Sequence, residues 1–267
     1  MAIEVFSRYE KKYLLTEENY HWILENISEH MVPDKFNKNG QLYNIANIYY
    51  DTSNDALIRA SIEKPVYKEK LRLRSYGVPA LEDKVFLEIK KKYKGLVNKR
   101  RTTLRLFEAY DLIEHGIDPG DQPYINRQVL EEIKYFLRVY DLKPKVYLTY
   151  DRQAFFSKDD RDFRITFDTN IKARREEVGL EKGNEGRLLI NNAFWLMEVK
   201  SSEAVPLWFT SLLSEKQIFS TSFSKYGTEY KQMIQNRDVC NMEGELLCPR
   251  QYLKQQLHYQ PLTHSLA

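Results

Sequence analysis

Alternation of charged and apolar residues is the clearest pattern in this chain. From Lys68 to Tyr76 (KEKLRLRSY) every second residue is basic or aromatic, and two of the residues between them are leucines. After a Gly-Val-Pro turn, the run Lys84 to Lys92 (KVFLEIKKK) repeats the alternation, and Asn98 to Arg105 (NKRRTTLR) does so again. Successive side chains of a β-strand point to opposite faces of the sheet, so these runs predict three strands that share a charged face.

The rest of the pattern predicts further strands separated by helices. Strands are expected at about residues 4–15, 42–51, 145–154, 162–171 and 194–200. Helical spacing and capping signals predict helices at about 17–31, 54–60, 106–116, 127–140, after Pro206 and after the SFSKYG segment. Seven or eight strands with few strand–helix–strand units favour a mainly antiparallel sheet, and a sheet of that size curls or closes. The expected class is α+β.

Composition describes a folded protein with one main domain. The chain has 267 residues, of which 42% are hydrophobic and 30% charged, and no Pro/Gly/Ser-rich linker divides it. Residues 1–236 carry the pattern, whereas 237–267 are polar and weakly patterned, so we expect a domain followed by a C-terminal appendage. The net charge of +3 is too small to indicate a nucleic-acid-binding protein by itself.

Cysteine usage and hydropathy predict a soluble protein of the cytoplasm. The two cysteines, Cys240 and Cys248, make neither a CxxC motif nor a disulfide framework. The N-terminus lacks the apolar core of a signal peptide. The longest apolar runs fall short of the roughly 18 residues that a membrane-spanning helix needs, so no transmembrane segment is expected.

Two interpretations of the charged faces are open at this point. They are a solvated sheet surface, or they line a tunnel if the sheet closes around them. Closure would bring many cations into one small volume, where repulsion and desolvation are costly without anions. The second interpretation therefore predicts a polyanion as the ligand. The cations concerned are Lys12, Arg72, Arg74, Lys90, Lys99, Arg101, Arg152 and Lys200.

Carboxylates on the same faces narrow the choice of polyanion. Glu10 and Glu198 each stand in an E-x-K strand, and Glu88 does so in LEIKKK. They either neutralise the lysines or act as oxygen ligands for Mn²⁺ or Mg²⁺, which bind phosphates through a few carboxylates and waters. Condensed phosphate with a divalent metal uses both sets of charges. Nucleic acid explains the carboxylates poorly and is not an expected partner.

Six short motifs in order resemble a known family. They are the N-terminal E-x-K, LRLRSY, LEIKKK, YDRQAF, LMEVK and SFSKY, between residues 4 and 235. This series is similar to the triphosphate tunnel metalloenzymes, and most of all to the VTC-type polyphosphate polymerase domain in its stand-alone bacterial form. Eukaryotic members tend to carry a second lysine shortly before S-K-Y, where this chain has Ser222.

The resemblance implies an antiparallel β tunnel of about eight strands wrapped by helices, with ATP and inorganic polyphosphate bound inside. It implies metal-assisted transfer of the γ-phosphoryl group of ATP to a growing polyphosphate, with Mn²⁺ or Mg²⁺ bound by Glu198. Whether the protein has a membrane-protein partner stays an open question. The residues expected to act in catalysis are Lys12, Arg72, Arg74, Lys90 and Glu198. Those expected to bind substrate are Glu10, Glu88, Lys99, Arg101, Arg152, Arg164, Lys200, Ser224 and Lys225.

Two other functions are compatible with most of these sequence features. The same fold with water as acceptor would be a tripolyphosphatase or nucleoside triphosphatase, and Glu10 and Glu88 are available to activate water. A non-catalytic polyphosphate-binding domain would keep the cations but would not need the metal carboxylate. Phosphoryl transfer relies mostly on alignment and charge stabilisation, so the missing nucleophile–base constellation does not argue against an enzyme.

Overall fold

The computed structural model describes residues 5–6, 9–37, 40–94, 96–160 and 162–242. They form one antiparallel sheet of eleven strands and six helices. The strands are β1 Val5–Phe6, β2 Tyr9–Thr16, β3 Met31–Pro33, β4 Tyr43–Asp51, β5 Tyr67–Tyr76, β6 Lys84–Tyr93, β7 Leu96–Arg105, β8 Lys143–Ser157, β9 Arg164–Arg174, β10 Arg187–Leu188 and β11 Phe194–Ser201. The helices are α1 Glu17–Ile27, α2 Ala56–Ile62, α3 Leu106–His115, α4 Arg127–Val139, α5 Leu207–Glu215 and α6 Lys225–Met242.

The sheet follows the order β1-β7-β6-β5-β4-β8-β9-β11-β2, with β10 beside β9 and β3 beside β8. Eight of the described strands have eight or more residues, which agrees with the expected number of about eight. The two ends of this path, β1 and β2, are joined by two residues of sequence. Among the described residues no ladder pairs β1 with β2, so the expected closure is not made by hydrogen bonds between the end strands.

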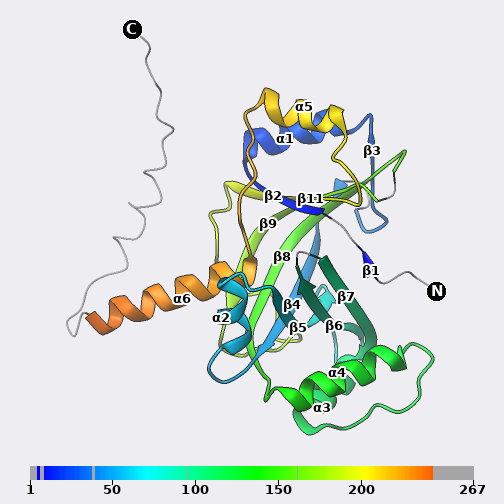
Figure 1. Cartoon of the computed structure of the whole chain (residues 1–267), viewed down its shortest axis with the longest axis vertical. Coiled ribbons are helices and arrows are strands. Elements are labelled where there is room, and N and C mark those ends of the chain that lie inside the picture. The colour runs from blue at the N-terminus through cyan, green and yellow to red at the C-terminus, as the bar shows by residue number, and fades with distance from the viewer. Residues whose placement is uncertain (1–4, 7–8, 38–39, 95, 161, 243–267) are drawn as a thin grey trace. The chain divides into compact units, whose positions relative to one another are not determined.

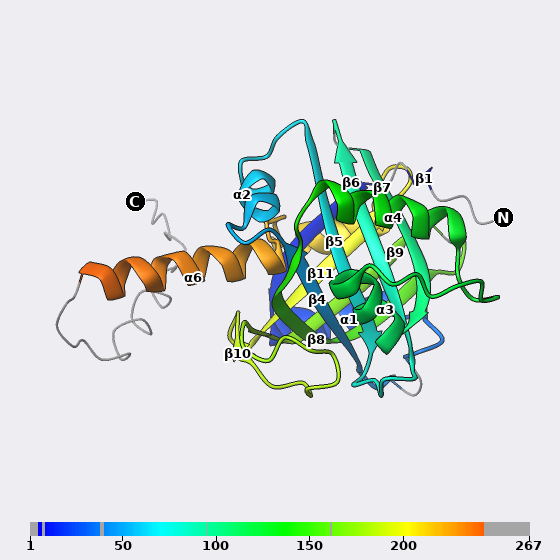
Figure 2. The same ribbon diagram turned by 90° about the horizontal axis from the view of Figure 1, so that it is seen from below.

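Two groups of helices cover the apolar face of the sheet (Figure 1). Helices α3 and α4 lie across β5–β7 and bury one core, in which Leu71, Leu87 and Ile133 are inaccessible or nearly so (Figure 2). Helices α1 and α5 cover β2, β9 and β11 and bury a second core around Phe167 and Phe209. The apolar positions of each strand are used for these cores, so the alternate, charged positions lie on the inner face.

Local signals in the sequence set several element boundaries. The Thr16 side chain accepts a hydrogen bond of 3.2 Å from the Asn19 amide and begins α1, as a helix N-cap does. Gly116 ends α3 with a positive φ of 70°, which glycine adopts without strain. The expected helix 17–31 is too long, because α1 ends at Ile27 and the chain then enters β3 beside β8.

The chain divides into a compact unit of residues 1–229 and a second unit of residues 230–267. Helix α6 begins in the first unit and continues to Met242, so the boundary expected at residue 236 falls within a helix and stays a prediction. Residues 243–267, with Cys248 among them, lie outside the described residues. Of the helices in the described ranges, none combines the length and the apolar character that crossing a bilayer requires.

Candidate functional site

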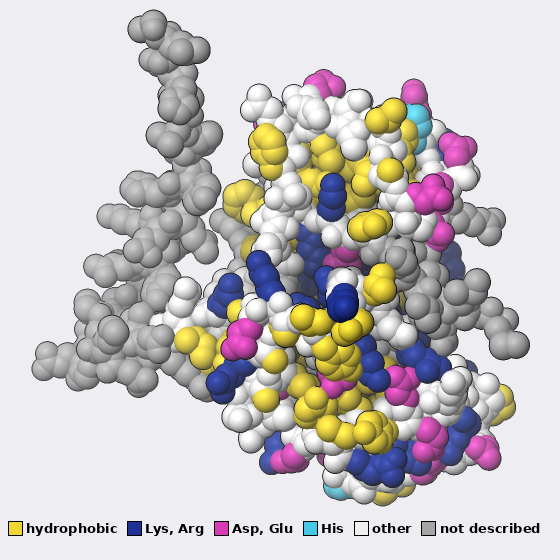
Figure 3. Space-filling view, in the orientation of Figure 1, with side chains coloured by type: hydrophobic (Ala, Val, Ile, Leu, Met, Phe, Trp, Pro, Cys, Tyr) yellow, Lys and Arg dark blue, Asp and Glu magenta, His cyan; other side chains and the backbone are white. Residues whose placement is uncertain are grey.

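The inner face of the sheet surrounds a polar cavity of about 280 Å³. Figure 3 shows Lys and Arg side chains gathered around a recess between the two helix-covered regions. Eleven basic side chains and two carboxylates line the cavity. All of the site residues expected from the sequence line it except Glu88: Glu10, Lys12, Arg72, Arg74, Lys90, Lys99, Arg101, Arg152, Arg164, Glu198, Lys200, Ser224 and Lys225.

Strand alternation brings the cations of β5, β6 and β7 together. The ladders place Arg72 opposite Glu88 and Glu88 opposite Arg101, and the next row joins Lys70, Lys90 and Lys99. Leu71, Leu73 and Leu87 point the other way, into the core under α3 and α4. The predicted division of these strands into a charged and an apolar face is therefore confirmed.

Glu88 lies beneath the cavity wall, with only 1% of its surface exposed. Its carboxylate is 2.6 Å from Arg72 Nε, 2.6 Å from Lys99 Nζ and 3.9 Å from Arg74 Nε. Burial raises the pKa of this carboxyl, but the charges of Arg72, Arg74 and Lys99 outweigh burial and hold it far below its usual range. Glu88 is thus an ionised counter-ion for three cations, and it does not itself face the cavity.

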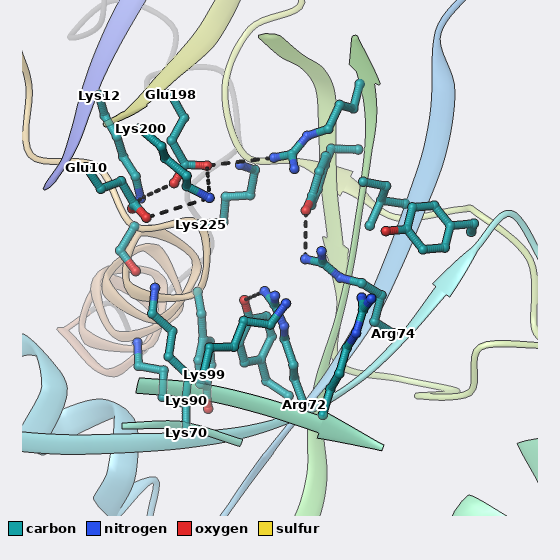
Figure 4. Close-up of a pocket in the computed structure, with 18 of the residues that line it drawn as sticks. Glu10, Lys12, Lys70, Arg72, Arg74, Lys90, Lys99, Glu198, Lys200 and Lys225 are labelled. Atoms are coloured by element: carbon teal, nitrogen blue, oxygen red, sulfur yellow. Dashed lines mark hydrogen bonds and ion pairs between the residues drawn. The ribbon is translucent and has the colours of Figure 1, made fainter. Parts of the chain in front are cut away.

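Strands β2 and β11 supply a second charged cluster on the facing wall (Figure 4). Their ladder pairs Glu198 with Lys12 and Lys200 with Glu10. Lys12 Nζ is 3.2 Å from the Glu10 carboxylate and 3.8 Å from that of Glu198, and Lys200 Nζ is 3.7 Å from Glu198. Burial opposes ionisation of Glu198, but Lys200 and Lys12 lower its pKa well below its usual range. Both carboxylates of this wall are therefore placed among lysines and face the cavity.

Lys225, the first residue of α6, reaches the cavity from the end of the sheet. Its Nζ lies 2.5 Å from Asp168 and 4.4 Å from the centre of the Tyr150 ring. Asp168 is fully buried and also accepts two hydrogen bonds from Arg152, at 2.6 and 2.8 Å. Asp168 therefore orients one cation from the sheet and one from the helix.

The structure adds cavity residues that the sequence analysis did not single out. Lys70 was predictable, because it alternates with Arg72 and Arg74 on one strand. Tyr43 and Tyr49 share a face of β4 by the same rule, but tyrosines at alternate positions are equally common in cores. Tyr226 had no usable signal, because its place depends on where α6 meets the sheet. The added residues are Tyr43, Ile45, Tyr49, Lys70, Tyr76, Tyr150 and Tyr226.

The field of the cavity changes the acidity of groups within it. Burial raises the pKa of Tyr150, but Arg74, Arg152 and Lys225 outweigh burial and lower it to about 8. Burial, with repulsion from Lys90 and Lys68, lowers the pKa of Lys70 to about 8. Negative charge is favoured and further positive charge disfavoured at both positions, as expected of a site that binds an anion.

The carboxylates of the cavity can hold a divalent metal only if a bound ligand supplies further oxygen atoms to it. In the described part of the chain, no group of three or more His, Cys, Asp or Glu side chains is placed to hold a metal. Glu10 and Glu198 are the two carboxylates in the cavity lining. Mg²⁺ is commonly held by one or two carboxylates together with substrate phosphates and water, and this pair fits that arrangement.

Comparison with known proteins identifies relatives of most of the chain. A model of the VTC domain family matches residues 7–234. The proteins named vacuolar transporter chaperone complex subunit 4 from Trypanosoma brucei brucei (strain 927/4 GUTat10.1) and Trypanosoma cruzi (strain CL Brener) are 24% and 23% identical over 84% of this chain. This chain spans about a third of their length, 34% in each case.

A solved structure shares the fold at low sequence identity. A Bacillus halodurans protein with a proposed adenylate cyclase assignment is 16% identical, covers 83% of this chain and 96% of its own, and superposes with a TM-score of 0.50. At this identity the similarity concerns the fold alone.

Proposed function

The chain belongs to the VTC domain family, and from that premise we propose that it is a polyphosphate polymerase, which transfers the γ-phosphoryl group of ATP to a growing inorganic polyphosphate inside a basic tunnel. The observation that carries the proposal is the charge of the cavity, where eleven basic side chains face two carboxylates. So large an excess of positive charge around one cavity is costly without an anion, and a polyanion as partner would offset that cost. A chain of condensed phosphates supplies one negative charge or more at each step along the cavity.

Phosphoryl transfer needs little covalent help from the protein. The transferred group passes through a loose transition state, so positioning and charge stabilisation account for most of the catalysis. Arg72, Arg74 and Lys99 are held in place by Glu88, and Arg152 and Lys225 by Asp168. Cations fixed in this way stabilise developing charge without reorganising during the reaction.

We assign Glu198 as the metal-binding carboxylate, with Mn²⁺ or Mg²⁺ as the cofactor and Glu10 beside it. Such an ion would neutralise phosphate oxygens and favour departure of the leaving group. Lys12 and Lys200 lie within 3.9 Å of both carboxylates, so they would keep Glu198 ionised and contact the same phosphates. Glu198→Gln should therefore weaken metal-dependent turnover more than binding of tripolyphosphate alone.

A hydrolase is the second candidate, and the position of Glu10 favours it. Glu10 lines the cavity, so its carboxylate could activate a water molecule against a bound triphosphate. Glu88 does not serve this role as well, because its carboxylate is buried and paired with cations. Because both candidates use ATP or condensed phosphate as substrate, we propose a cytoplasmic location. The complex-subunit relatives suggest a partner protein as well.

Resolving the products by length separates the candidates. The purified protein is incubated with ATP and Mn²⁺ or Mg²⁺, and the phosphates are separated on a gel. A polymerase gives a ladder that lengthens with time, whereas a hydrolase gives orthophosphate or pyrophosphate. A protein that binds tripolyphosphate but leaves both ATP and tripolyphosphate unchanged with either metal would refute both enzymatic assignments.

A further inference from the structure

Two rows of lysines cross the ladder between β5 and β6. Lys70 pairs with Lys90, and Lys68 pairs with Lys92. The first row lines the cavity and is seen at its edge in Figure 4. The second row lies two residues further along the same face, about 7 Å at the usual rise per residue, and outside the cavity lining. The basic surface therefore continues beyond the cavity at the end of the sheet next to α2.

In the part of the chain that the structure describes, no carboxylate forms an ion pair with these rows. In the described ranges neither Lys90 nor Lys92 forms an ion pair with a carboxylate. Lys68 Nζ donates a hydrogen bond of 3.1 Å to the backbone carbonyl of Ser61 in α2, which is a neutral acceptor and not a counter-ion. Like charges directly opposite each other destabilise a sheet. Burial, and after it repulsion from Lys92, Lys90 and Lys64, lowers the pKa of Lys68. The lowered pKa reflects the same repulsion between neighbouring positive charges.

The other ends of these strands are built differently. The last row of the β6–β7 ladder pairs Lys84 with Arg105. Arg105 forms a 3.0 Å ion pair with Glu82, and Lys84 lies 4.8 Å from the centre of the Tyr124 ring. At the far end of β5, Tyr76 stacks on Phe36 at 5.1 Å. Unpaired lysines facing one another are thus a feature of the α2 end of β5 and β6.

We propose that a polyphosphate chain longer than the cavity leaves it at the α2 end of β5 and β6 and binds Lys68 and Lys92 there. The site would take condensed phosphate, because a flexible chain of closely spaced charges can follow two consecutive lysine rows. This inference rests on the proposed function, since it assumes that phosphates occupy the cavity next to Lys70 and Lys90. It adds an external phosphate-binding path that favours long chains over short ones.

The test compares a short and a long ligand on matched variants. Inorganic tripolyphosphate and long-chain inorganic polyphosphate are titrated by calorimetry, without metal, into the wild-type protein, Lys68→Gln/Lys92→Gln and the control Lys84→Gln/Arg105→Gln. Both doubles remove two positive charges from a row at the end of a ladder or next to its end in the same sheet. The first should lose about tenfold in affinity for the long chain and keep its tripolyphosphate affinity. The salt dependence of long-chain binding should also fall in that variant alone.

Three results would overturn the inference. They are equal losses for the two ligands, a loss in the control variant as large as in Lys68→Gln/Lys92→Gln, and a wild-type protein that binds both ligands alike. None of these affects the proposed function, which is refuted separately if the wild-type protein binds neither ligand. Single Lys92→Gln serves if the double variant does not fold, because Lys92 has no ion pair in the described structure to lose. It should show the same selectivity with a smaller loss.

Discussion

At the scale of single residues, the cavity depends on carboxylates that lie behind its cations. Glu88 and Asp168 are both buried, and each holds cations from different elements at 2.8 Å or less. Arg74 is fixed in another way, because its Nε donates to Asn47 at 2.9 Å and its terminal nitrogen to Tyr150 at 3.1 Å. A guanidinium held on one side can offer its remaining N–H groups to phosphate.

Removal of either β5 arginine should reduce phosphate binding strongly. A charge-assisted hydrogen bond contributes about 1.5–3 kcal/mol, so Arg72→Ala or Arg74→Ala should weaken tripolyphosphate binding at least about tenfold. Arg138→Ala is the control, because Arg138 lies exposed on α4. Calorimetry measures binding, and circular dichroism checks that the variants fold. A double Arg72/Arg74 variant with wild-type affinity would mean that these side chains do not contact the ligand.

Loss of the Glu88 charge should destabilise the protein and change its response to acid. Glu88→Gln removes the buried counter-ion of Arg72, Arg74 and Lys99, which should lower the free energy of unfolding by about 3 kcal/mol at neutral pH. The folded-state pKa of Glu88 is lowered from 4.5, so its contribution is complete above that pH and is lost as the pH falls below it.

Urea unfolding at a series of pH values measures both effects. The difference between the wild-type protein and Glu88→Gln should be largest near neutral pH and should shrink below about pH 4.5. A difference that stays constant down to pH 3, or an unchanged stability at pH 7, would show that Glu88 is not an ionised counter-ion.

At the scale of elements, strand alternation predicted most of the site. A period of two is set by backbone geometry, so the faces of β5, β6 and β7 could be assigned before their partners were known. Strand alternation could not show how deeply a side chain of the charged face is buried. Glu88 shares the charged face with Lys90, but whether it reaches the cavity depends on the long cations of neighbouring strands that fold over it. The place of Tyr226 depends on α6 meeting the sheet, a contact far apart in sequence.

The row of lysines across β5, β6 and β7 should link phosphate binding to proton uptake. Burial, with repulsion from Lys90 and Lys68, lowers the pKa of Lys70 to about 8, so near pH 8 this amine is partly neutral in the free protein. A bound polyanion favours the charged form and raises that pKa again. Binding near pH 8 should therefore take up protons, and the share of this uptake that belongs to Lys70 should be small below about pH 7, where Lys70 is already charged.

Calorimetry of tripolyphosphate binding in two buffers of different ionisation enthalpy measures this uptake. Lys70→Arg is the matched control, because an arginine keeps the charge and does not titrate in this range. Protonation of the ligand is common to both proteins, so the difference between them belongs to Lys70. An uptake that is the same in Lys70→Arg at pH 8 would contradict the assignment.

At the scale of the whole molecule, the two faces of one sheet have different roles. Its outer face is buried by two groups of helices, and on its inner face the described cavity lining holds eleven basic side chains and two carboxylates. The chain belongs to the VTC domain family, and its fold is shared by a solved structure. Because the chain spans about a third of its curated relatives, 34% of each, it is the charged cavity that carries the functional assignment.

The most direct test is to follow both products of the reaction at once by phosphorus NMR, with ATP and Mg²⁺, in the wild-type protein and in Glu198→Gln. The account predicts that internal polyphosphate signals and ADP rise together, one phosphate added for each ADP, and that Glu198→Gln forms neither at a comparable rate. Orthophosphate rising in step with ADP, without internal phosphates, would contradict the polymerase. Polymer formed by Glu198→Gln at the wild-type rate would contradict the role given to the cavity carboxylate.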